Sequence, residues 1–136
     1  MKKIAFIGIG NMAGAMITGL SQNAPDATLT LFDLDAAKAA AKAAEAHAIA
    51  AGSLEEACTG QNAIILAVKP VHMPALLSEI TPLIKPGQLV ITVAAGVLLQ
   101  KYEEALPQAH IIRSMPNTSA HVLASMSGLI AGATAT

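Results

Sequence analysis

The chain has 136 residues, a formal net charge of −1 and 54% hydrophobic residues, while aromatic residues make up only 2%. This length is sufficient for one domain with a buried core, and the apolar content excludes a disordered chain. The balanced charge and the scarcity of aromatic rings argue against a nucleic-acid partner, which would require a basic surface or base-stacking side chains.

The N-terminus and the single cysteine indicate in which compartment of the cell the protein is expected. Lys2 and Lys3 precede an apolar run, as in a signal peptide, but glycines and Asn11 interrupt that run. Every apolar run is shorter than the roughly 18 residues of a membrane span. Cys58 is the only cysteine, so an intrachain disulfide is impossible and a reducing compartment fits. We therefore expect a cytoplasmic protein without a membrane partner, in which Cys58 is a small buried hydrophobe.

The first half of the chain alternates strand-like and helix-like segments. An apolar run predicts a buried parallel strand over residues 4–7, and a helix follows over 12–21. A second strand is expected over 28–32, followed by an alanine-rich helix over 36–48 that Asp35 caps. The sheet-facing positions of the first helix are Met12, Met16, Gly19 and Leu20, and the solvated face of the second carries Lys38, Lys42, Glu45 and His47.

The alternation continues to the end of the chain. A weak strand over 48–51 precedes Ser53 and Glu56, a capping-box pair that begins a short helix ending at Cys58. Pro74 lies near the start of a helix that ends at about residue 83, and Pro86-Gly87 forms a turn. Further strands are expected over 63–68, 89–93, 111–114 and 126–130, with a helix over 99–106. This order predicts a single α/β domain with a doubly wound, mostly parallel sheet of the Rossmann type.

The first strand leads directly into the motif G-x-G-x-x-A at residues 8–13. Gly8 permits a tight turn, Gly10 leaves room for an approaching phosphate, and Ala13 lets the helix pack close to the strand. Such a turn aims backbone N–H groups and a helix N-terminus at a pyrophosphate. The motif predicts a dinucleotide site, and the alternative is an ordinary tight turn between a strand and a helix.

Asp33 lies 20 residues after Ala13, at the end of the second expected strand. A carboxylate at this position accepts hydrogen bonds from ribose hydroxyls and repels a 2′-phosphate. Lys38 is the nearest cation, and no arginine lies nearby. NADH is therefore expected to be favoured over NADPH. The alternative is that Asp33 only begins the turn before the helix.

Three further strand ends fall at the edge where ligands bind in such sheets. Their residues are Ala67, Val68, Lys69 and Pro70, then Ala94, Ala95 and Gly96, and then Met115, Pro116, Asn117 and Thr118. Each segment is also compatible with ordinary turn chemistry. The four histidines lack metal-ligand spacing, and His121 is the one that lies close to Asn117. Neither a metal site nor a catalytic side chain is predicted.

In this order and spacing, the segments resemble pyrroline-5-carboxylate reductase, an NAD(P)H-dependent enzyme of proline synthesis. The matching stretches are F-I-G-I-G-N-M-A at 6–13, L-A-V-K-P at 66–70, A-A-G-V at 94–97 and R-S-M-P-N-T at 113–118. The resemblance implies hydride transfer to the C=N bond of 1-pyrroline-5-carboxylate, giving proline. It also implies that the pyrophosphate is held by Ile7, Gly8, Gly10, Asn11 and Met12, and that residues 67–70 and 94–96 line the cofactor, with Asn117 nearby.

Two features depart from the family pattern. Asp33 stands where many members have a polar or basic stretch that favours NADP. The family's second domain, all-helical and responsible for dimerisation and most of the substrate pocket, has no counterpart within residues 1–136. The resemblance therefore implies a truncated form that binds the cofactor and is inactive alone.

Two other functions are compatible with these residues. A ligand-sensing nucleotide-binding module has a similar size and an acid after its second strand, but has no need of the segments at 69–70 and 115–118. Another dehydrogenase of the same superfamily, acting on a hydroxy acid or a deazaflavin, would share the glycine motif.

Overall fold

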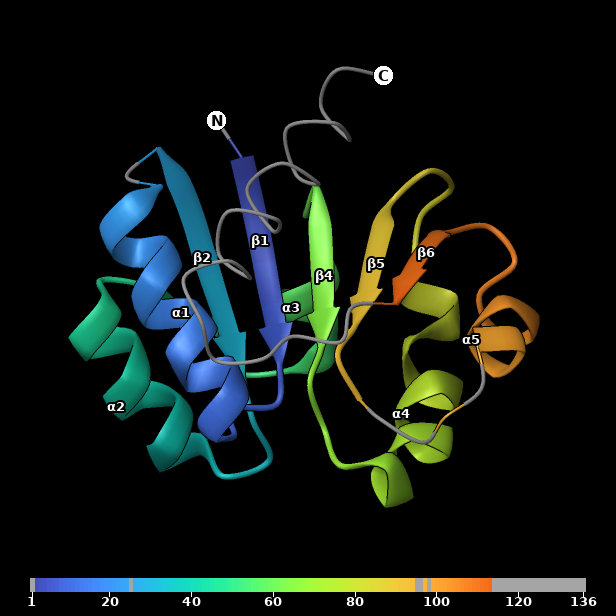
Figure 1. Cartoon of the computed structure of the whole chain (residues 1–136), viewed down its shortest axis with the longest axis horizontal. Helices are drawn as coiled ribbons and strands as arrows, with labels where there is room; N and C mark the ends of the chain where they lie inside the picture. The colour runs from blue at the N-terminus through green and yellow to red at the C-terminus, as the bar shows by residue number, and fades with distance from the viewer. Residues whose placement is uncertain (1, 25, 95–96, 98, 114–136) are drawn as a thin grey trace.

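The computed structural model describes residues 2–24, 26–94, 97 and 99–113. In this part of the chain, strands and helices alternate as the sequence predicts (Figure 1). The strands are β1 (Lys2–Ile7), β2 (Ala27–Phe32), β3 (Ile49–Ala50), β4 (Ala63–Leu66), β5 (Leu89–Thr92) and β6 (His110–Arg113). The helices are α1 (Asn11–Asn23), α2 (Ala36–Ala46), α3 (Leu54–Cys58), α4 (Met73–Ile80) and α5 (Leu99–Ala105), with 3-10 turns η1 (Pro70–His72) and η2 (Thr81–Leu83) on either side of α4.

The six strands form one sheet in the order β3-β2-β1-β4-β5-β6, and every pairing is parallel. The chain moves outward from β1 in one direction and then returns to add β4 on its other side. The predicted doubly wound Rossmann-type fold is confirmed. Ile7 pairs with Phe32 on one side and with Leu66 on the other, so these strands end at the same level. The residues that follow them therefore meet at one edge, which we call the carboxyl edge of the sheet.

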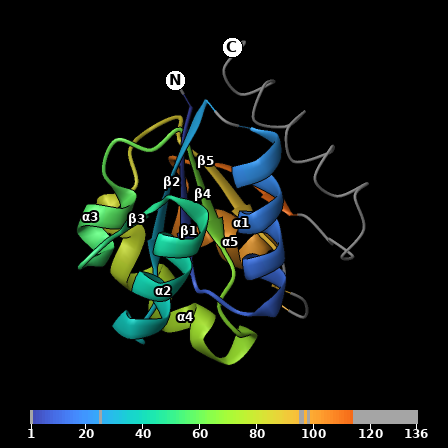
Figure 2. The same cartoon turned by 90° about the vertical axis from the view of Figure 1, so that its left-hand side faces the viewer.

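Alternate residues of the strands point to opposite faces and build two cores. Ile4 and Phe6 of β1 pack on the face covered by α1 and α2, whereas Ala5 and Ile7 pack on the face covered by α3, α4 and α5. Figure 2 shows α1 and α3 on opposite sides of the sheet. Because both faces are covered, the strands read as continuous apolar runs.

Side-chain caps begin two of the helices as the sequence predicts. Asp35 accepts a hydrogen bond from the Lys38 N–H (3.2 Å) at the start of α2, and Ser53 accepts one from the Glu56 N–H (3.1 Å) at the start of α3. The Glu56 carboxylate reaches back to the N–H of Gly52 (2.9 Å), one residue before the cap. Both helix starts are thus specified locally, by short side chains that accept backbone hydrogen bonds.

Some expected bounds and orientations differ. Helix α2 ends at Ala46 because His47 takes the left-handed conformation (φ 56°), and the Ala48 N–H closes the turn on the Ala43 carbonyl (2.8 Å). His47 is therefore outside the helix. Met12 is 37% exposed, so the prediction that it packs on the sheet is wrong. The expected strand at 126–130 lies outside the described residues.

Cys58 is fully buried at the end of α3, as predicted. Desolvation by burial raises the pKa of its thiol to about 11. The thiol therefore stays protonated at neutral pH, and it packs as a small apolar group without the character of a nucleophile.

Candidate functional site: a pocket at the carboxyl edge of the sheet

The two glycines of the motif have different structural roles. Gly8 has a φ of +99°, and a Cβ built on it would lie 2.9 Å from the carbonyl carbon of Ala67 and from the nitrogen of Val68. Only glycine fits a turn this close to the end of β4. A Cβ on Gly10 would meet nothing within 4 Å. Gly10 therefore leaves open space in front of α1.

Helix α1 begins at this open space. Gly10 is its N-cap residue and has an extended backbone, and no side chain from the part of the chain that the structure describes caps the first turn. The first amides of a helix have no partner within the helix, and its dipole favours negative charge at that end. The N-terminus of α1 is thus an uncapped group of donors facing open space, which suits a phosphate.

Asp33 connects the ends of β1 and β2. Its Oδ2 accepts a hydrogen bond from the Ile9 N–H (2.7 Å), and its Oδ1 accepts one from the Asp35 N–H (2.9 Å). The Gly8 N–H donates to the Phe32 carbonyl (2.8 Å). The turn at residues 8–10, which we call the glycine turn, is therefore held to the end of β2 by two hydrogen bonds, one from Gly8 and one from Ile9. An ionised carboxylate has about four lone-pair positions. Asp33 therefore fixes the turn and keeps acceptor capacity for a ligand.

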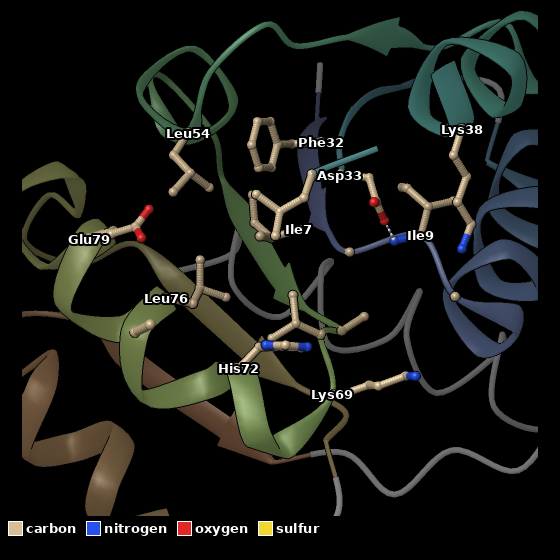
Figure 3. Close-up of a pocket in the computed structure, with 16 residues that line it drawn as sticks. Ile7, Ile9, Phe32, Asp33, Lys38, Leu54, Lys69, His72, Leu76 and Glu79 are labelled. Atoms are coloured by element: carbon tan, nitrogen blue, oxygen red, sulfur yellow. Dashed lines mark hydrogen bonds between the residues drawn. The ribbon is translucent and has the colours of Figure 1, made fainter. Parts of the chain in front are cut away.

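These groups open into a pocket of about 350 Å³ at the carboxyl edge of the sheet (Figure 3). It is lined by the ends of β1, β2 and β4, by Leu54 at the start of α3, and by one face of α4. Asp33 and Glu79 contribute carboxylates, and Lys38, Lys69 and His72 contribute nitrogen donors. The remaining lining residues are Ile7, Gly8, Ile9, Gly10, Phe32, Leu34, Ala67, Val68, Ala75 and Leu76. The lining of the pocket is largely apolar, with a few charged groups.

A second, shallower groove of about 460 Å³ lies between α1 and α2. It shares Ile9, Gly10 and Lys38 with the pocket. Along the groove, the Lys42 ammonium donates to the Thr18 hydroxyl (2.7 Å) and to the Glu45 carboxylate (3.2 Å). These bonds join the two helices.

The structure brings together half of the residues expected at the site. Ile7, Gly8, Gly10, Asp33, Ala67, Val68 and Lys69 line the pocket, and Asn11 lines the neighbouring groove. Met12, Pro70 and Ala94 line neither: Met12 is exposed on α1, Pro70 begins η1, and Ala94 is buried beyond β5. Ala95, Gly96 and Asn117 lie outside the described residues.

The sequence interpretation missed the apolar end of the pocket. That end is formed by the apolar side chains of Phe32, Leu54, Ala75 and Leu76, and it was missed together with His72 and Glu79, which line the pocket next to it. The one available signal was the spacing of His72, Leu76 and Glu79, which recur on one face of a helix. Among the described residues, no group of three or more His, Cys, Asp or Glu side chains is placed to hold a metal ion. Within the same residues, every helix is too short or too polar to cross a bilayer.

The chain matches known proteins in sequence over most of its length. The profile of the family described as "NADP oxidoreductase coenzyme F420-dependent" matches residues 3–96. A pyrroline-5-carboxylate reductase from Pseudomonas aeruginosa is 38% identical over 133 residues, which are 96% of this chain and 49% of that protein. The chain thus spans about half the length of the curated relatives it matches.

Solved structures with the same fold superimpose on this chain. A pyrroline-5-carboxylate reductase from Coxiella burnetii superimposes with a TM-score of 0.80 at 23% identity, over 96% of this chain and 55% of that one. A pyrroline carboxylate reductase from Plasmodium falciparum, with NADP bound, gives a TM-score of 0.69 at 26% identity over 86% of this chain and 43% of that one. With the profile match over residues 3–96, these likenesses lead to one conclusion: the chain belongs to the NADP oxidoreductase, coenzyme F420-dependent family, and its resemblance to the pyrroline-5-carboxylate reductases is confirmed.

Proposed function

We propose that this chain is the cofactor-binding domain of a pyrroline-5-carboxylate reductase, which reduces the C=N bond of 1-pyrroline-5-carboxylate to give L-proline. When bound, the nicotinamide cofactor supplies the hydride. The observation that carries the proposal is the meeting of the open, uncapped N-terminus of α1 with the Asp33 carboxylate in one pocket. The 38% identity to the Pseudomonas aeruginosa enzyme supports the choice of reaction.

In this proposal, each part of the pocket has a role in holding the dinucleotide. The first amides of α1 bind the pyrophosphate, and Gly10 leaves room for it. Asp33 accepts hydrogen bonds from the adenosine ribose, and the apolar end of the pocket takes the adenine. Ala67, Val68 and Lys69 line the side of the pocket formed by β4. We assign Asn11, Met12, Pro70, Ala94, Ala95, Gly96 and Asn117 to the same cofactor site on the family resemblance alone.

The substrate pocket and the dimer contacts belong, in this proposal, to a helical domain outside residues 1–136. Residues 1–136 are expected to bind NADH and to show no reduction of pyrroline-5-carboxylate, because the substrate has nothing to position it against the cofactor. The check is oxidation of NADH followed at 340 nm, with binding measured separately by fluorescence titration. Turnover by residues 1–136 alone would refute this division of roles.

A chimera tests the reaction itself. Residues 1–136 replace the corresponding half of the Pseudomonas aeruginosa relative, and the parent enzyme is the control. We expect the chimera to reduce pyrroline-5-carboxylate. A chimera that folds and binds NADH but reduces another imine, a hydroxy acid or a deazaflavin instead would favour a different oxidoreductase of the same family. A chimera that folds and binds NADH but reduces none of these substrates would favour the ligand-sensing nucleotide-binding module instead.

We further propose that NADH binds more tightly than NADPH, by about tenfold, because the Asp33 carboxylate repels a 2′-phosphate. Lys38 also lines the pocket and offsets part of this repulsion. The measurement is fluorescence titration with each nucleotide. Asp33→Asn should bring the two affinities within about threefold, because it removes the charge that repels the 2′-phosphate. The amide oxygen can replace only one of the two oxygens that accept the Ile9 and Asp35 N–H groups, so both nucleotides should also bind more weakly.

Asp35→Asn is the matched control for this comparison. It removes one negative charge two residues away, and asparagine caps a helix as well as aspartate does. The control should leave the preference for NADH unchanged. Tighter binding of NADPH by the wild type would mean that the charge of Lys38 outweighs that of Asp33.

A cytoplasmic location is also part of the proposal, and the free, buried Cys58 is consistent with it.

A further inference from the structure

The surface of α4 that faces the pocket carries a hydrogen-bond acceptor, the Glu79 carboxylate. His72, Ala75, Leu76 and Glu79 follow one another at helical spacing and all line the pocket. Figure 3 shows the Glu79 carboxylate on the side of the pocket opposite Lys38, on the same side as Leu54. Among the described residues, this carboxylate has no hydrogen-bond or ion-pair partner.

The wall around this carboxylate is apolar. Phe32, Leu54 and Leu76 line the same end of the pocket, and Leu76 is 8% exposed. Such a wall suits the faces of a flat aromatic ring, and the carboxylate at its end accepts a hydrogen bond from the ring edge. An ionised carboxylate is an acceptor only, so it favours a ring that presents an N–H donor.

The other acids and bases of the pocket leave Glu79 as the acceptor for this end. Asp33 lies at Ile9, on the Lys38 side of the pocket, and its remaining acceptor capacity is assigned to the ribose. Lys38 and Lys69 are donors only. His72 lies between Lys69 and Leu76 in Figure 3, and among the described lining residues it is the one other side chain at this end that can accept a hydrogen bond.

We propose that Glu79 is a specificity-determining residue for the purine base, whose carboxylate accepts a hydrogen bond from the 6-amino group of adenine. This inference rests on the proposed function, because it takes the pyrophosphate to lie at Gly10 and the ribose at Asp33. The base then extends away from α1 into the apolar end of the pocket. A base with an acceptor or a hydrogen at position 6 loses this bond.

The experiment compares two ligands that differ at one position. Calorimetry measures binding of ADP-ribose and of its purine-riboside analogue, in which hydrogen replaces the 6-amino group. ADP-ribose lacks nicotinamide, so the comparison does not depend on the segments at 94–96 and 117. For the wild type, we expect ADP-ribose to bind about tenfold more tightly than the analogue, as for a hydrogen bond to a charged acceptor.

Two variants separate the hydrogen bond from packing. Glu79→Ala should weaken ADP-ribose binding to within twofold of the analogue and leave the affinity for the analogue unchanged. Glu79→Gln should keep most of the preference, because the amide oxygen still accepts. Glu103→Ala, which removes an exposed carboxylate from α5 outside the pocket, is the control and should behave as the wild type.

The outcomes distinguish this inference from the proposed function. Equal binding of the two ligands to the wild type, or a preference that survives in Glu79→Ala, would overturn the role of Glu79 and leave dinucleotide binding intact. A wild type that binds neither ligand would overturn both.

Discussion

Gly10→Val is expected to weaken NADH binding about 100-fold or more while the domain remains folded. The extended backbone of Gly10 is accessible to any residue, and a Cβ there meets nothing within 4 Å. The valine side chain would instead fill the space in front of α1, where the pyrophosphate is proposed to accept charge-assisted hydrogen bonds. Loss of two such bonds corresponds to about 3 kcal/mol or more, hence the factor of 100.

Fluorescence titration measures the affinity, and urea unfolding measures the stability of the same protein. The stability should fall by about 1 kcal/mol at most, since valine is a poor N-cap residue. Ala15→Val is the matched control: it adds the same branched side chain at an exposed position one turn further along α1. It should keep the affinity of the wild type. Normal NADH binding by Gly10→Val would refute the assignment of the turn to the pyrophosphate.

Gly8→Ala should destabilise the domain by about 3 kcal/mol, a large part of the stability of a domain this size. About 1–2 kcal/mol comes from forcing a side chain into the left-handed backbone region at φ +99°. The rest comes from the overlap of the new Cβ with the backbone of Ala67 and Val68, each 2.9 Å away. Backbone atoms at a strand end have little freedom to move aside. The measurement is the free energy of unfolding from urea titration.

Gly60→Ala separates the two contributions to this loss. Gly60 also has a positive φ, of +72°, but a Cβ built on it meets nothing within 4 Å. Its substitution should therefore cost only the backbone strain, about 1 kcal/mol. If Gly8→Ala were no more destabilising than Gly60→Ala, the close approach of β1 and β4 would contribute nothing to the requirement for glycine.

The strands and caps were predictable because their signals are local. The apolar run at 4–7 corresponds to β1, and Asp35 and Ser53 cap α2 and α3 as expected. The expected strand at 63–68 ends early, at Leu66. Its partner β1 turns away at Gly8 and its partner β5 ends at Thr92, so the ladder cannot continue. Strand length is set here by neighbours, which the apolar run alone does not reveal.

The glycine-turn half of the candidate site was predictable, and the other half was not. Gly8, Gly10 and Asp33 belong to a motif whose spacing follows from one strand, one turn and one helix. Leu54, Leu76 and Glu79 come from two helices far apart in the sequence. They line the same pocket because α3 and α4 pack on one face of the sheet. Their residue types alone indicate an ordinary amphipathic helix.

The order of apolar runs, caps and glycines was by itself enough to determine a parallel α/β sheet with a dinucleotide-type turn after its first strand. These features depend on backbone conformation and side-chain periodicity, both of which act over a few residues. Only the tertiary structure decided that Asp33 holds the Ile9 N–H, that Gly8 touches the end of β4, and that α4 presents Glu79 to the pocket. The physical reason is that each of these contacts joins segments that are brought together by burial of the two cores. The hydrophobic effect is non-directional, so the apolar pattern of the sequence does not reveal which surfaces will meet.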